Sequence, residues 1–405
     1  MKNDAEFLYL TAAEAAAELS VSPATLYAYV SRGLIRSEAV AASRAKRYSA
    51  DDVRALKNRR GPYPAARGAP DDGSVLDSAI STITAQGPLY RGVLATKLAE
   101  QATLEETATL LWDITADDPF AEDNMPPSTP DFEAVRAAMA DCQPLARAIA
   151  LTALAGGEDP RAFNRSPFGR AETGARVMRL VTSAILGTSP SPAPIHKQIA
   201  SVWAPNDARA VDLIRRAVVL LAEHELNASA YTVRCATSTD INFYEATIAG
   251  LAALKGRRHG GAGPLAARLL DVLSAGDIAA NIRERSMLGE DFHGFGHAVY
   301  ENGDPRAENL LSALSRAGAD PRLTRDAPRL VQETTGLFPT IDYALAVMTR
   351  MFGLPVGHEI AIFAIARTAG WIAHAMEQQA ARKLIRPRAR YTGPAAGRSQ
   401  IADLI

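Results

Sequence analysis

The sequence has only two cysteines, Cys142 and Cys235, in 405 residues. Two are too few for a disulfide framework, and neither has a basic motif nearby that would activate a thiolate, so both are interpreted as structural. The sequence also lacks an apolar run close to the roughly 20 residues of a membrane-spanning helix, and its N-terminus lacks the apolar segment of a signal peptide. These absences predict a cytoplasmic protein with no membrane span.

The sequence lacks an excess of charge of either sign. Its 44 lysines and arginines nearly cancel its 45 aspartates and glutamates, which gives a formal net charge of −1. The overall charge therefore indicates neither a nucleic-acid partner nor an acidic membrane surface, and local clusters have to be considered instead. The length exceeds that of one typical domain, so two or three domains are expected.

Strand-like alternation is scarce in the sequence. Ala- and Leu-rich segments with helical spacing dominate after residue 73, for example at 95–112. We therefore expect a mainly α-helical body, in which the glycine-rich stretches 256–264 and 294–307 are loops between helices. Residues 61–73 contain three prolines and three glycines, which is a linker composition and places a domain boundary after residue 60.

The segment before this linker has the spacing of a helix-turn-helix. Residues 11–35 are interpreted as two helices separated by a tight turn near Leu19. Ser22 would cap the second helix, with Pro23 in its first turn. The region 34–56 predicts a short wing followed by a third helix, and the whole resembles the winged helix-turn-helix of the MerR and excisionase type.

Local charge in this segment favours nucleic acid. From Pro23 to Arg60 there are nine basic and three acidic residues, a local balance of +6. DNA phosphates favour such a surface. Small helix-turn-helix units also mediate protein contacts and their basic faces are often only solvated, so DNA binding through residues 11–60 and protein interaction are both open interpretations.

Two of the seven histidines, His259 and His297, lie in glycine-rich loops, where backbone can approach a ligand closely. His293 and His297 have H-x3-H spacing, which could suggest a metal pair. The intervening Gly294 and Gly296 disfavour the helix that would put both rings on one face, so no metal site is expected.

Six motifs follow one another in the body of the chain. They are HELNAS (224–229), LKGRRHGGA (254–262), GFGHAVYENGDPRA (294–307), FPTID (338–342), IARTAGWIAHAMEQ (365–378) and LIRPRARYTGP (384–394). Their order and spacing resemble the citrate synthase family from about residue 74 to the C-terminus. The resemblance implies a helical large domain at 74–260 and 351–405 and a small domain at 261–350. The small domain would close over the large one to exclude water.

The resemblance implies a Claisen condensation of acetyl-CoA with oxaloacetate to citrate and CoA, with propionyl-CoA and 2-methylcitrate as the nearest variant. This chemistry needs a base beside the acyl methyl group and a hydrogen-bond donor at the thioester oxygen, where enolate charge develops. By motif match, Asp342 is the base and His259 the donor. His297 would polarise the ketone of oxaloacetate.

The resemblance also assigns side chains to the two carboxylates of oxaloacetate. Arg306, Arg367 and Arg386 take this role by motif match, since guanidinium groups bind carboxylates bidentately. His224 is a further contact. In the family the equivalent of Arg386 reaches in from the other protomer, which implies a homodimer with shared active sites. The alternative is that Arg386 belongs to a solvated basic tail.

Acyl-CoA is implied as a co-substrate, and no permanently bound cofactor is expected. The acyl-CoA would lie over the loop that contains Gly294, Phe295 and Gly296. Arg257 or Arg258 would meet its phosphates.

Departures from the family pattern occur beside His259. The family usually continues HGGA with Asn-Glu, whereas Gly263 and Pro264 follow here, and Arg257 and Arg258 replace the usual Pro-Leu. The pocket around His259 is therefore expected to differ from that of other members.

A second function from another class stays open. The chain could be a transcription regulator whose synthase-like body senses CoA esters or dicarboxylates, and the helix-turn-helix favours this alternative. The complete set of His259, His297 and Asp342 favours catalysis, because a sensor needs anion-binding arginines but no base.

Overall fold

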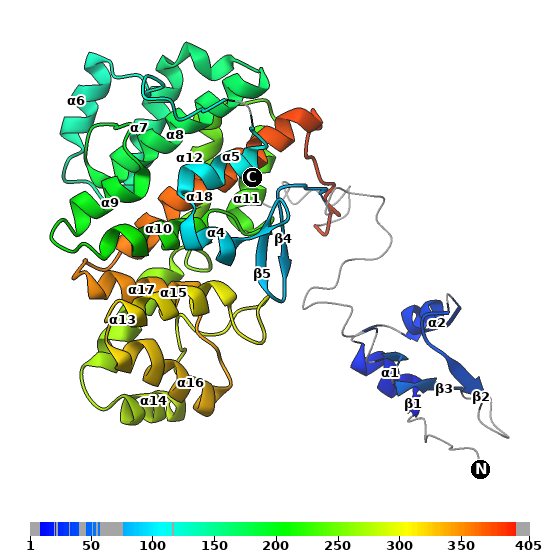
Figure 1. The fold of residues 1–405 in the computed structure, drawn as a ribbon. Coiled ribbons are helices and arrows are strands. Elements are labelled where there is room, and N and C mark those ends of the chain that lie inside the picture. The colour runs from blue at the N-terminus through cyan, green and yellow to red at the C-terminus, as the bar shows by residue number, and fades with distance from the viewer. Residues whose placement is uncertain are drawn as a thin grey trace, which may run out of the picture. The chain divides into compact units, whose positions relative to one another are not determined.

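The computed structural model describes residues 9–19, 21, 23–31, 33–39, 46–50, 52–53, 56, 76–115 and 117–393 (Figure 1). The chain divides into two compact units, Met1–Ser74 and Val75–Ile405, which are treated separately below. The predicted linker at 61–73 and the predicted cap Ser22 lie outside the described residues.

The N-terminal unit combines two helices with a three-stranded antiparallel sheet. In chain order its described elements are β1 (Tyr9–Thr11), α1 (Ala12–Glu18), α2 (Pro23–Ser31), β2 (Ser37–Ala39) and β3 (Lys46–Ser49). The pairing of β2 with β3 forms the predicted wing. β1 pairs with the other edge of β3 and was not expected from the sequence. The predicted third helix lies partly outside the described residues.

A small apolar core holds the two helices on this sheet. Leu26 and Tyr29 of α2 are buried against Ala15 of α1 and Tyr48 of β3. α1 begins with a reciprocal cap, because Thr11 N donates to Glu14 Oε2 at 2.8 Å and Glu14 N donates to Thr11 Oγ1 at 3.3 Å. Burial of α2 against α1 and the cap of α1 thus both support the helix-turn-helix predicted from the sequence.

Helices form most of the C-terminal unit, as the sequence predicts. They are α4 (Ala95–Gln101), α5 (Leu104–Trp112), α6 (Pro130–Ala138), α7 (Pro144–Glu158), α8 (Pro167–Leu186), α9 (Ile195–Trp203), α10 (Ala210–Leu221), α11 (Ala228–Thr237), α12 (Phe243–Leu254), α13 (Ala262–Ser274), α14 (Ile278–Met287), α15 (Pro305–Arg316), α16 (Ala327–Thr335), α17 (Ile341–Met351) and α18 (His358–Ala381), with short turns at Pro160–Phe163 and Arg322–Asp326. A small antiparallel sheet contains β4 (Ser81–Thr84), β5 (Gly87–Tyr90) and β6 (Val93–Leu94). No helix in the described part of the chain is long and apolar enough to cross a bilayer.

Capping side chains set where several of these helices begin. At α5, Thr103 N donates to Glu106 Oε2 at 2.7 Å and Glu106 N donates to Thr103 Oγ1 at 3.1 Å. At α11, Asn227 Oδ1 accepts the backbone N–H groups of Ser229 and Ala230, both at 3.1 Å. The HELNAS motif therefore marks a helix start.

Both predicted glycine-rich loops end earlier than the sequence suggests. The expected loops cover 256–264 and 294–307, but α13 already begins at Ala262 and α15 at Pro305. Proline lacks the N–H that the first helical turn leaves unpaired, so a proline in these sequences opens a helix and does not extend the loop.

The core of the C-terminal unit is built around α18, whose interior positions from Ala361 to Ala375 are all buried. α18 packs against α5, α8, α10, α11 and α12. Figure 1 shows α13 to α17 grouped at one end of this unit, beside the end of α18 at which His358 lies. The division into a large domain at 74–260 and 351–405 and a small domain at 261–350 stays a prediction.

We expect the close packing of α12 on α18 to make Gly250→Ala destabilising. A Cβ atom at Gly250 would lie 2.6 to 2.9 Å from ring atoms of Trp371. Overpacking of this kind costs about 1–3 kcal/mol. The change is measured as the free energy of unfolding in urea.

Gly157→Ala is the matched control. Gly157 lies in α7 with no heavy atom within 4 Å of its ideal Cβ position. This substitution should raise stability by about 0.4–1 kcal/mol, because it reduces the entropy of the unfolded chain. Equal effects of the two variants would contradict the tight α12–α18 contact.

Candidate active site

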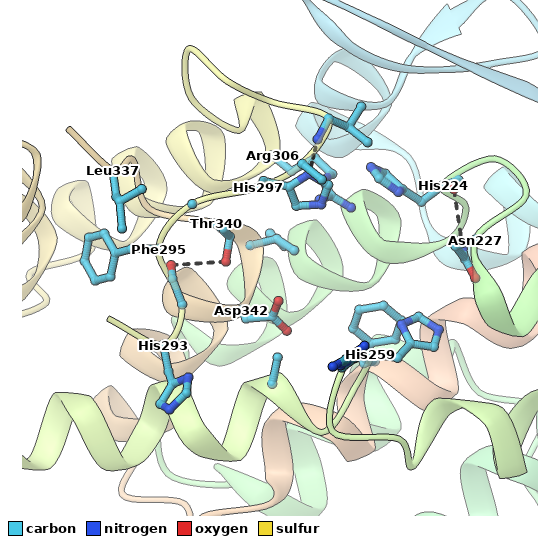
Figure 2. Close-up of a pocket in the computed structure, with 18 of the residues that line it drawn as sticks. His224, Asn227, His259, His293, Phe295, His297, Arg306, Leu337, Thr340 and Asp342 are labelled. Atoms are coloured by element: carbon cyan, nitrogen blue, oxygen red, sulfur yellow. Dashed lines mark hydrogen bonds between the residues drawn. The ribbon is translucent and has the colours of Figure 1, made fainter. Parts of the chain in front are cut away.

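A cavity of about 700 Å³ collects side chains from distant parts of the C-terminal unit (Figure 2). Ten residues predicted as site residues line it: His224, Arg258, His259, Gly294, Phe295, Gly296, His297, Arg306, Asp342 and Arg367. They come from the segment between α10 and α11, the loop before α13, the loop before α15, and helices α15, α17 and α18. The fold therefore brings together residues that are up to about 140 positions apart in sequence, as Arg367 and His224 show.

Two predicted site residues do not line this cavity. Arg257 is exposed in the turn before His259, and Arg386 is exposed in the segment that follows α18. The role of Arg257 at the acyl-CoA phosphates stays a prediction. The same holds for Arg386, which the family resemblance assigns to the cavity of a partner protomer.

The loop that carries His297 is built by glycines. Gly294 and Gly296 have φ values of +88° and +78°, a backbone conformation that residues with a Cβ atom rarely adopt. A Cβ atom at Gly294 would lie 2.9 Å from Ala266 Cβ, so the loop packs too closely on α13 for a larger residue. Thr340, at the start of α17, donates to the Gly294 carbonyl from both its backbone N (2.8 Å) and its hydroxyl (3.1 Å).

The hydrogen bonding of His297 fixes its tautomer. Val299 N donates to His297 Nδ1 at 3.1 Å, so Nδ1 carries no proton and a neutral ring carries its proton on Nε2. Burial, together with the nearby charge of Arg306, lowers the pKa of His297. His297 is therefore a neutral hydrogen-bond donor through Nε2.

His259 is held by Ser229, a residue to which the sequence analysis assigned no role. His259 Nε2 lies 2.7 Å from Ser229 Oγ, which also accepts a hydrogen bond from Trp371 Nε1 at 3.0 Å. Burial, followed by the charge of Arg367, lowers the pKa of His259 to about 4. The single proton of the Ser229 hydroxyl has two acceptors, Asn227 Oδ1 at 2.8 Å and His259 Nε2. When it goes to Nε2, the neutral ring carries its proton on Nδ1 and can donate there to a ligand.

Asp342 occupies the first turn of α17 and is partly buried. Figure 2 shows its side chain between His259 and the loop that carries His297. Burial raises the pKa of Asp342 to about 6, although the charges of Arg306 and Arg367 act in the opposite direction. The group is therefore ionised at neutral pH but is a stronger base than an ordinary aspartate.

Arg306 is oriented by Asp304. Arg306 Nε and Nη2 donate to the two oxygens of Asp304 at 2.9 and 2.8 Å, and Asp304 Oδ2 also accepts Ile341 N at 3.0 Å. Burial opposes ionisation of Asp304, but the charge and hydrogen bonds of Arg306 outweigh it and hold the pKa of Asp304 below its usual value. Both charges are thus retained in the cavity wall.

Arg367 supplies an unpaired cationic donor. Its Nε donates to the Leu221 carbonyl at 2.8 Å, which fixes the guanidinium. Its Nη2 atom is buried and has no hydrogen-bond partner among the described residues. A buried guanidinium N–H without an acceptor is costly, so this atom is suited to a carboxylate ligand.

His224 lines the cavity and contacts Tyr300, which is not one of the lining residues. His224 Nε2 lies 2.9 Å from the Tyr300 hydroxyl, and the His224 and His297 ring centroids are 5.6 Å apart. Burial lowers the pKa of His224 well below its usual value and raises the pKa of Tyr300 to about 12. The imidazoles of His224, His259 and His297 are therefore all neutral in the cavity wall.

A sequence-family model described as "Citrate synthase, C-terminal domain" matches residues 71–388. The chain belongs to the citrate synthase family. This membership confirms the resemblance carried by the six motifs. A second model, described as "Helix-turn-helix domain", matches residues 9–61 and confirms that element of the N-terminal unit.

Curated relatives of the citrate synthase part of the chain include both 2-methylcitrate synthases and citrate synthases. A 2-methylcitrate synthase of Mycobacterium tuberculosis is 36% identical over 197 residues, which cover 45% of this chain and 48% of that protein. A citrate synthase of Haloferax volcanii is 36% identical over 197 residues, which cover 47% and 52%. The chain spans about half the length of the curated relatives it matches.

Solved citrate synthases share the fold. The ternary complex of the Thermoplasma acidophilum enzyme with carboxymethyl coenzyme A and oxaloacetate matches 82% of this chain and 97% of that chain, with 24% identity and a TM-score of 0.67. The Thermotoga maritima citrate synthase matches 81% and 96%, with 23% identity and a TM-score of 0.66. These likenesses confirm the mainly α-helical fold expected from the sequence.

No group of three or more His, Cys, Asp or Glu residues is placed to hold a metal ion within the part of the chain that the structure describes. The loop of His293 and His297 instead places His297 in the cavity wall, beside Arg306 and Tyr300.

We expect the His259 ring to stay neutral from pH 8 down to pH 5, because burial lowers its pKa to about 4. NMR titration of histidine-labelled protein measures this, with the His259→Gln variant identifying the signal. A free imidazole titrates near 6.5 and serves as the reference. An inflection of the His259 signal above pH 6 would contradict the effect of burial.

Proposed function

We propose that this chain is a citrate synthase-like acyltransferase that condenses acetyl-CoA with oxaloacetate to give citrate and CoA, or propionyl-CoA to give 2-methylcitrate. The observation that carries the proposal is that Asp342, His259 and His297 line one cavity with Arg306 and Arg367. Family membership and the names of the relatives from Mycobacterium tuberculosis and Haloferax volcanii support it. A cytoplasmic location and the absence of a permanently bound cofactor are part of the proposal.

The first step is enolisation of the acyl-CoA. The Asp342 carboxylate takes a proton from the methyl carbon, and its pKa of about 6 makes it a better base than an ordinary aspartate. His259 donates a hydrogen bond to the thioester oxygen as enolate charge develops there. The neutral ring is suited to this role because it donates a proton without adding a fixed positive charge.

The second step forms the carbon–carbon bond. The enolate carbon attacks the ketone carbon of oxaloacetate, while His297 Nε2–H polarises the ketone oxygen and donates to the developing alkoxide. Arg306 and Arg367 bind the carboxylates, and His224 is a further contact. Water then hydrolyses the thioester and releases CoA. The Thermoplasma acidophilum citrate synthase forms a complex with carboxymethyl coenzyme A and oxaloacetate, which supports these two kinds of substrate.

The proposal includes a homodimer and a moving small domain. Arg386 is exposed in the segment after α18, a placement that suits contact with a second protomer. The grouping of α13 to α17 suits a small domain at 261–350 that closes over the cavity (Figure 1). Phosphates of the acyl-CoA would meet Arg258 at the cavity wall, with Arg257 nearby.

Purified full-length protein should release CoA from acetyl-CoA or propionyl-CoA only when oxaloacetate is present. In Asp342→Asn we expect kcat to fall at least about 100-fold, because the base is lost. Thiol release measures turnover, and calorimetry tests whether the variant still binds oxaloacetate.

Asp123→Asn, at an exposed aspartate outside the cavity, is the control and should keep its activity. Unchanged turnover in Asp342→Asn would refute the mechanism. Absence of release by folded wild-type protein that binds oxaloacetate would favour the sensor alternative.

A second candidate function is DNA binding by the N-terminal unit, by which the chain would act as a regulator that senses CoA esters or dicarboxylates. The helix-turn-helix match at 9–61 and the β2–β3 wing favour it. Lys46 at the start of β3 is exposed and adds positive charge to the wing, whereas the neighbouring Arg47 is paired with Glu38 of β2 at 3.2 Å. The two functions are compatible in one chain.

Full-length protein should bind duplex DNA with an affinity that falls steeply as salt rises, because phosphate contacts release counterions. Fluorescence anisotropy with a labelled duplex measures this. Lys46→Gln should reduce the salt slope by about 1 if Lys46 contacts a phosphate. If a truncated chain that begins at Val75 bound DNA equally well, the helix-turn-helix would not be the DNA-binding part.

A further inference from the structure

A second cavity, of about 550 Å³, lies at the C-terminal end of α18. Its walls come from the segment before α8, the end of α11 and the end of α18, and the residues are Arg165, Arg170, Thr237, Ser238, Asp240, Gln378, Gln379, Arg382 and Lys383. It shares no lining residue with the catalytic cavity. The proposed reaction makes no use of these side chains.

The second cavity has an excess of positive charge. Four cationic side chains and one carboxylate, that of Asp240, line it. Arg165 Nη1 forms an ion pair with Asp240, so this carboxylate is already neutralised. The side chains of Arg170, Arg382 and Lys383 make no hydrogen bond or ion pair with any described residue. Three cations therefore share one cavity without a counter-ion from the described chain.

Arg170 is the most constrained of these cations. Its Nε atom is buried and has no acceptor among the described residues. Burial, together with the like charges of Arg165 and Arg382, lowers the pKa of Arg170. A partly buried cation beside other cations is unfavourable unless an anion offsets the charge.

Two neutral polar groups of the same cavity are also unsatisfied. Thr237 Oγ1 and Gln379 Oε1 are buried without a hydrogen-bond partner among the described residues. Gln379 is fixed in place, because its Nε2 donates to the Ile241 carbonyl at 3.1 Å. Buried polar groups are normally paired, so these atoms are suited to the polar part of a bound molecule.

We propose that this second cavity binds a small compound that carries a diphosphate group. The three unpaired cations match the charge of two linked phosphoryl groups, and the Arg170 guanidinium can bind phosphate oxygens bidentately. Thr237 and Gln379 hydrogen-bond the remaining polar groups of the ligand. The cavity volume lies within the roughly 300–1,000 Å³ range of small-molecule sites. This site is independent of the catalytic cavity and of the reaction proposed for it.

The test uses full-length protein and inorganic pyrophosphate as the probe, with binding measured by isothermal titration calorimetry at low ionic strength. We expect one pyrophosphate per chain and an affinity at least tenfold above that for sulfate. Arg170→Gln and Lys383→Gln should each weaken binding at least tenfold. Lys383 is exposed, so its variant keeps the test informative if Arg170→Gln folds poorly.

Arg283→Gln and Lys97→Gln are the matched controls, because both residues are exposed and lie outside both cavities. They should leave the pyrophosphate affinity unchanged. Absence of binding to the wild type would overturn the proposal, as would equal binding to the Lys383 variant and the wild type. Loss of affinity for CoA itself in Arg170→Gln would also overturn it, since the cavity would then serve the substrate.

Discussion

The buried carboxylate of Asp304 is the constraint on which the cavity around Asp342 depends. It accepts two hydrogen bonds from the Arg306 side chain, a third from the Arg306 backbone and a fourth from the backbone of Ile341, the residue before Asp342. One side chain thereby ties the start of α15 to the start of α17. Removing one partner of such a buried pair typically costs about 3–5 kcal/mol. The loss would displace both the proposed base, Asp342, and Arg306, which is proposed to bind a substrate carboxylate.

Burial also sets the protonation state of the cavity. It lowers the pKa values of His224, His259 and His297 and raises that of Asp342. One physical cause thus has opposite effects on acids and bases, since it always disfavours the charged form. The result at neutral pH is a set of neutral imidazoles beside the basic carboxylate of Asp342, which suits the enolisation and the addition to a ketone proposed for this cavity.

Supporting residues were harder to predict than the residues they support. Ser229, Tyr300 and Asp304 all lie inside motifs recognised in the sequence, but their roles depend on distances between separate segments. Ser229 contacts His259 across 30 positions of sequence, and its second partner, Trp371, comes from α18. The motifs therefore marked the positions of these supporting residues, but they did not show which residues each one contacts.

The sequence by itself determined the helical class, the helix-turn-helix, the family and the set of candidate residues. Local sequence patterns predict each of these: helical periodicity, cap residues, glycines in loops and short ordered motifs. Tertiary structure alone decided which side chains share a cavity, which pKa values burial shifts, and which arginine atoms stay unpaired. These properties depend on burial and on contacts between distant segments, and a local pattern carries no information about either.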